Sequence, residues 1–111
     1  MLSEYEIRNL IYTSQRLNRG FISILFYSPW DETSNSIVEL AKTLGVVYNQ
    51  EFYLVDLFEQ PELSTLFQIN RSPTLVVMNS SRLDVIDIPC AIIRELKYIS
   101  RSNSLSHSHE V

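Results

Sequence analysis

The hydrophobic pattern changes its period along the chain and predicts alternating helices and strands. Apolar residues recur at helical spacing in some segments and form short, nearly continuous runs in others. The first pattern is typical of amphipathic helices, and the second of strands buried on both faces. The expected helices are 2–17, 30–48, a short one from Pro61, and 89–100, and the expected strands are 21–27, 51–57, one ending at Met78, and 83–88.

Local signals mark several ends of these segments. Ser3 followed by Glu6 has the form of a capping box at the first helix. Gly20 suits a left-handed residue after that helix, and the stretch 79–82 is typical of a hairpin turn. Gly45 lies inside a predicted helix, where it costs about 1 kcal/mol relative to Ala, so we expect a bend or close packing there.

The element order predicts one α/β domain with a mixed sheet. Two βα units of the parallel type are followed by a hairpin and a last helix. We expect this domain to span residues 1–100 of the 111-residue chain. Residues 101–111 are rich in Ser and contain two His, and are expected to form a disordered tail.

Composition and charge exclude several classes of function. The net charge of −4 disfavours a nucleic-acid partner, which would require a basic face. No apolar run approaches the roughly 20 residues of a membrane span, and the N-terminus lacks the apolar region of a secretory signal. Only one Cys is present, so neither an internal disulfide nor a multi-cysteine zinc site is expected. A reducing, cytoplasmic location is the expectation.

The stretch Ser28–Ser34 follows directly on the apolar run 21–27, so a buried strand leads into the start of a helix. Free N–H groups and the macrodipole favour anions and nucleophiles at such a start. The stretch resembles the active-site turn of thioredoxins, F-W-A-x-W-C-G-P-C-K, with Trp30 at the place of the family's tryptophan. Residues 55–63 and 69–75 are similar to the family's V-D-x-x-x-x-P-x-L and I-R-x-x-P-T-L.

The resemblance covers about residues 5–100 and implies a thioredoxin-like fold. That fold is a central mixed four-stranded sheet flanked by about four helices. It also implies a cis bond between Ser72 and Pro73, beside the active-site turn, where the family offers backbone to a bound peptide.

The departures from the family concern its redox chemistry. Asp31 and Ser34 stand where the family has two cysteines, and neither can attack or close a disulfide. Leu25 stands at the family's buried carboxylate, and the usual lysine partner falls near Phe52. The resemblance therefore implies a redox-inactive member and not a disulfide oxidoreductase.

Each residue of the turn also has a purely structural interpretation. Asp31 could be a functional carboxylate, or it could serve the helix start through the pattern Ser28-x-x-Asp31. Trp30 could anchor a partner, or it could pack against the turn at Pro73. Ser34 would need a neighbouring base to act as a nucleophile.

The remaining candidates lie later in the chain. Cys90 follows Pro89, which aligns with a family loop beside the active site, so Cys90 is either a reactive thiol or a small buried hydrophobe. His107 and His109 lie in the expected tail, where they favour neither a base for Ser34 nor a metal site. No metal and no cofactor are expected.

The sequence favours a redox-inactive thioredoxin-like module that binds another protein or a peptide segment. Such a module would act as an adaptor, an assembly chaperone or a subunit, and would use the former active-site groove. The alternative hypotheses are a thioredoxin-fold enzyme that uses glutathione, a sensor with monothiol chemistry, and a homodimer built on the aromatic surface. The candidate partner-binding residues are Trp30, Asp31, Ser34, Ser72, Pro73 and Cys90.

Overall fold

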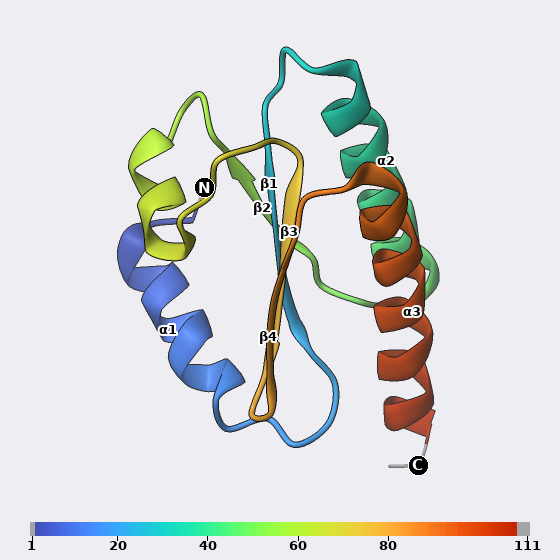
Figure 1. Cartoon of the computed structure of the whole chain (residues 1–111). Coiled ribbons are helices and arrows are strands. Elements are labelled where there is room, and N and C mark those ends of the chain that lie inside the picture. The colour runs from blue at the N-terminus through green and yellow to red at the C-terminus, as the bar shows by residue number, and fades with distance from the viewer. Residues whose placement is uncertain (1, 109–111) are drawn as a thin grey trace.

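A computed structural model describes the backbone of residues 2–108 and the side chains of residues 2–102 (Figure 1). It confirms the predicted α/β class and the mixed four-stranded sheet. Among the described residues, no helix is both long enough and apolar enough to cross a bilayer. The elements are α1 (Glu4–Ser14), β1 (Ile22–Tyr27), α2 (Glu32–Val47), β2 (Tyr53–Asp56), the 3-10 helix η1 (Pro61–Phe67), β3 (Thr74–Asn79), β4 (Arg82–Ile86) and α3 (Pro89–Ser108).

The sheet has the strand order β2-β1-β3-β4. β1 and β2 run parallel, with Tyr27 beside Asp56, whereas β1 is antiparallel to β3 and β3 is antiparallel to β4. The central position of β1 explains why residues 22–26 are all buried and why four of these five residues are apolar.

Helices cover both faces of the sheet (Figure 1). α2 and α3 pack on one face, where Leu25 of β1 joins Ile37 of α2 and Leu96 of α3 in one core cluster. α1 and η1 lie over the other face, where Phe26 of β1 joins Ile7 of α1 in a second cluster. Successive residues of β1 therefore enter different cores, as the period of two in a strand requires.

Three of the predicted local signals are present in the structure. Ser3 and Glu6 form the capping box at the start of α1. Gly20 has φ of 72°, in the left-handed region that favours glycine. A Cβ on Gly45 would lie 2.8 Å from the carbonyl oxygen of Gln50, so this position is one of close packing.

Two helix ends differ from the prediction. α1 stops at Ser14 because a tighter turn follows, in which Leu17 N–H donates to the Ser14 carbonyl. α3 continues to Ser108 instead of ending near residue 100, and no Gly or Pro occurs in 101–108 to stop it. The other residues of the expected tail, 109–111, lie outside the described residues.

Two buried serines are expected to respond to Ala in opposite directions. Ser14 Oγ–H donates to the Ile11 carbonyl at 2.7 Å. Ser14→Ala removes this hydrogen bond and should lower the free energy of unfolding by about 1 kcal/mol. Ser23 Oγ is buried on β1 without a hydrogen-bond partner among the described side chains and backbone. Ser23→Ala removes an unpaired hydroxyl and should stabilise the fold by about 1 kcal/mol. Urea unfolding of both variants checks this, and shifts of the same sign would contradict it.

Tyr53 on β2 predicts a loss of stability at high pH. Burial, followed by the hydrogen bond to Glu51 Oε1 at 2.9 Å and the charge of Glu51, raises the pKa of Tyr53 to about 12. The unfolded chain has a tyrosine pKa of about 10, so it loses this proton first, and stability should fall between about pH 10 and about pH 12. Tyr53→Phe should reduce that fall in urea unfolding, and an equal fall in the variant and the wild type would contradict the prediction.

Candidate functional site

The segments predicted to form a site meet at one end of the sheet. β1 and β2 end there, β3 begins there, and β4 ends there before α3 (Figure 1). This arrangement brings the turn 28–31, the loop 57–60, the Ser72–Pro73 bond and the start of α3 to the same end of the molecule.

Asp31 is the N-cap of α2, with φ of −102° and ψ of 118°. Its Oδ1 accepts from the Thr33 N–H at 3.1 Å, and its Oδ2 accepts from the Ser34 hydroxyl at 3.0 Å. Asp31 is thus a helix cap, as its structural interpretation predicts, and the Ser28 carbonyl accepts from the Asp31 N–H in the preceding turn. Both carboxylate oxygens of Asp31 therefore stabilise the helix start.

Ser34 lies beneath this cap and is fully buried. Besides its bond to Asp31, its Oγ lies 3.5 Å from Oγ of Ser72, which is partly exposed. The neighbouring Pro73 is buried, and the Ser72–Pro73 peptide bond is cis. The structure thus joins Asp31, Ser34 and Ser72 in one chain of polar contacts, in which Ser34 is an internal link and not a surface group.

Trp30 projects from the turn before α2 with 75% of its surface exposed. Its ring packs edge-to-face on Phe58, with the ring centroids 5.5 Å apart and the planes at 88°. Phe58 is itself 65% exposed. We call these two residues the aromatic pair. Phe58 is not among the residues predicted from the sequence, where its one signal is an aromatic side chain in the loop between Asp56 and Glu59.

A groove of about 270 Å³ lies between the loop after β2, with the helix η1 that follows it, and the segment before β3. Leu57 of its wall directly precedes Phe58 in the chain. Ser72 forms part of its wall, together with apolar side chains from both segments. The lining residues are Leu57, Pro61, Ser64, Ile69, Asn70, Arg71 and Ser72.

Carboxylates surround the end of β1. Asp56 ends β2, and its Oδ1 accepts from the N–H groups of Phe58 and Glu59 at 2.8 and 3.2 Å. Burial, and then the charges of Asp56 and Glu59, raise the pKa of Tyr27, the last residue of β1. The loop that carries Phe58 therefore places negative charge beside the turn that carries Trp30.

Cys90 is exposed in the first turn of α3, at the same end of the sheet. Within the described residues, no hydrogen bond joins it to Trp30, Ser34 or Ser72. No group of three or more His, Cys, Asp or Glu in the described part of the chain could hold a metal ion. The side chain of His107 and all of His109 lie outside what the structure describes.

Comparison with solved structures identifies the architecture. A thioredoxin from Malassezia sympodialis aligns with a TM-score of 0.67 and 16% identity, over 90% of this chain and 88% of that one. Mitochondrial thioredoxin 3 from Saccharomyces cerevisiae aligns with a TM-score of 0.64 and 24% identity, over 84% of this chain and 87% of that one. The chain has a thioredoxin-like fold. Its sequence matches no protein-family model and no curated protein.

A third similar structure comes from work on the thiol resolving mechanism of a yeast mitochondrial 1-Cys peroxiredoxin. It aligns with a TM-score of 0.67 and 24% identity, over 87% of this chain and 91% of that one. Likeness at this level of identity establishes the thioredoxin-like fold alone. The chain has a single cysteine, so it cannot form a disulfide within itself.

Leu25 and Phe52, which the resemblance sets at or near the family's buried carboxylate and its lysine partner, both pack in the core. Leu25 is fully buried between the sheet and the helices α2 and α3, and Phe52 packs against the same cluster. Neither side chain can take up or release a proton. This thioredoxin-like fold therefore has no titratable group at either position.

Proposed function

We propose that the chain is a redox-inactive thioredoxin-like module that binds a segment of another protein, as an adaptor, an assembly chaperone or a subunit. The observation that carries the proposal is the exposed aromatic pair, Trp30 and Phe58, at the end of the sheet where Asp31 begins α2. Trp is one of the residue types that are enriched at the energetic centre of protein interfaces.

The surroundings of the pair support binding in preference to redox chemistry. Dithiol exchange needs both a thiolate nucleophile and a resolving thiol. By the resemblance, Asp31 and Ser34 occupy the two positions at which thioredoxins carry these thiols. Their side chains bond to one another at 3.0 Å and so stabilise the turn that presents Trp30. In this proposal the turn has kept its shape while its reactive groups have been replaced.

Affinity capture with a matched control tests the binding role. The wild type, a Trp30→Ala/Phe58→Ala variant and a Val46→Ala/Val47→Ala variant are immobilised, and the retained proteins are compared. Val46 and Val47 are also exposed apolar residues, but they lie at the far end of α2. We expect a partner that the wild type and the valine variant retain and that the aromatic variant loses at least about tenfold. If all three immobilised proteins retain the partner equally, the aromatic pair does not contribute to its binding, which would contradict the proposal.

The exposure of Cys90 favours one alternative, monothiol chemistry in a sensor or enzyme. Dithiothreitol-driven reduction of insulin distinguishes the redox-inactive binding module from monothiol chemistry at Cys90. Under our proposal, the wild type does not accelerate the reaction above its uncatalysed rate. Acceleration that Cys90→Ser abolishes would favour the alternative.

A further inference from the structure

The aromatic pair leaves ring faces open to a ligand. In an edge-to-face contact, the ring that presents its edge keeps both of its faces free, and the other ring keeps one. The 88° angle between Trp30 and Phe58 and their high exposure fit this description. Open faces of Trp and Phe attract cations through the quadrupole of the ring, and Trp does so most strongly.

The charged side chains next to the aromatic pair in the sequence are all acidic. Within the described residues, the ion pairs of Lys and Arg are formed with Glu4, Glu39, Asp84 and Glu95, all of them in other parts of the chain. The carboxylates beside the aromatic pair in the sequence take part in none of these ion pairs. They are Asp31, Glu32, Asp56 and Glu59.

Arg71 is the one basic residue on the wall of the neighbouring groove. The groove itself is small, since small-molecule sites in proteins are commonly about 300–1,000 Å³. Its volume and partly apolar wall suit a side chain of a bound segment better than a cofactor. An acidic segment would have to approach four carboxylates in order to meet one arginine.

We propose that the segment bound at the aromatic pair is basic: a Lys or Arg side chain lies on the open ring faces, and an adjacent apolar side chain enters the groove beside Ser72. This inference rests on the proposed function, and it names the chemistry of the partner. Cation–π attraction and charge complementarity act together here, and both oppose acidic segments.

The single Trp of the chain makes the test direct, because intrinsic Trp fluorescence reports on Trp30 alone. Three capped peptides without aromatic residues are titrated: Lys-Leu-Lys-Leu-Lys, Gln-Leu-Gln-Leu-Gln and Glu-Leu-Glu-Leu-Glu. We expect a saturable change with the lysine peptide, at an affinity at least about tenfold above that for the other two. Raising NaCl from about 50 to about 500 mM should weaken this binding about tenfold.

Substitutions locate the effect. Phe58→Ala should weaken lysine-peptide binding about tenfold, and Asp56→Asn/Glu59→Gln should weaken it at least about fivefold. Asn keeps an oxygen that can accept the N–H groups of the loop, so the loop is preserved. Glu39→Gln/Glu51→Gln removes the same number of charges at exposed positions, one within α2 and one before β2, at the opposite end of that strand from Asp56, and should leave binding unchanged.

Four results would overturn the inference. Equal weakening by the near and the distant charge variants would mean non-specific attraction to an acidic protein. Stronger binding of the neutral or the acidic peptide would show a different partner chemistry. If no peptide binds but a partner is captured in a way that depends on Trp30 and Phe58, the inference of a basic segment is wrong, whereas the proposed protein-binding function stands. If the wild type neither captures a partner nor binds a peptide, the proposed function is wrong as well.

Discussion

Replacing Phe26 with Ala is expected to lower the free energy of unfolding by about 3–5 kcal/mol. Phe26 lies on the central strand β1 and is fully buried. Its ring packs edge-to-face on Phe67 of η1, with the centroids 5.8 Å apart. It also belongs to the cluster that holds Ile7 of α1 against the sheet. Truncation would leave a cavity between the sheet and two helices, and a strand at the centre of a sheet cannot move to close it.

Phe58→Ala is the matched control for Phe26→Ala. The chemical change is the same, but Phe58 is 65% exposed, so its truncation should cost less than about 1 kcal/mol. Urea unfolding followed by far-UV circular dichroism measures both variants. Similar midpoints for the two would contradict the assignment of Phe26 to the core.

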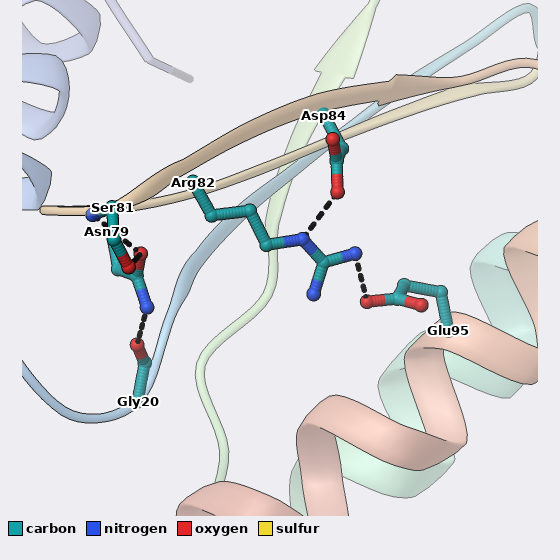
Figure 2. A network of polar contacts seen from close by, with 6 residues as sticks. All are labelled: Gly20, Asn79, Ser81, Arg82, Asp84 and Glu95. Atoms are coloured by element: carbon teal, nitrogen blue, oxygen red, sulfur yellow. Dashed lines mark hydrogen bonds and ion pairs between the residues drawn. The ribbon is translucent and has the colours of Figure 1, made fainter.

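Replacing Arg82 with Met is expected to lower the free energy of unfolding by about 2 kcal/mol. Figure 2 shows the guanidinium between Asp84 of β4 and Glu95 of α3. Its Nε donates to Asp84 Oδ2, and its Nη2 lies 2.6 Å from Glu95 Oε1. The guanidinium carbon also lies 5.2 Å from the centre of the Phe21 ring. Burial lowers the pKa of Arg82, but the hydrogen bonds and charges of the two carboxylates outweigh it and raise that pKa, so the fold stabilises the charged form.

The cost arises mainly at Glu95, whose side chain is only 18% exposed. Without Arg82 its carboxylate would remain largely buried without a cation, whereas Met preserves much of the apolar stem. Adding Glu95→Gln to Arg82→Met should therefore recover part of the loss. Lys42→Met is the control, because its ion pair with Glu39 spans 3.7 Å at an exposed site and should be worth less than about 0.5 kcal/mol. Equal losses for Arg82→Met and Lys42→Met would refute the role of this network.

The sequence was a good guide to the elements because their signals are local. The apolar run 22–26, the Ser3 capping box and the left-handed Gly20 each depend on a few neighbouring residues, and all are found in the structure. The sequence does not mark the end of the last helix, since Ser and Asn neither stop nor strongly favour a helix. The structure places that end at Ser108, past the expected one.

The sequence indicated part of the candidate site and missed part of it. The spacing of Asp31 and Ser34 and the motif at Pro73 concern residues that the structure brings together at one end of the sheet. Phe58 was missed because its partner Trp30 lies in a different loop, and no local pattern joins the two. Ser34 was expected to face a partner, but its hydroxyl points to Asp31 and Ser72 inside the fold.

The sequence by itself determined the class of fold, the order of its elements and the absence of a second cysteine, since these depend on hydrophobic period and residue identity. Only the tertiary structure decided which side chains meet across the sheet and between loops. Parallel β1 and β2 bring Trp30 and Phe58 together, and the packing of α3 on the sheet brings Glu95 to Arg82. Such contacts join residues distant in sequence, and their positions follow from how whole elements pack.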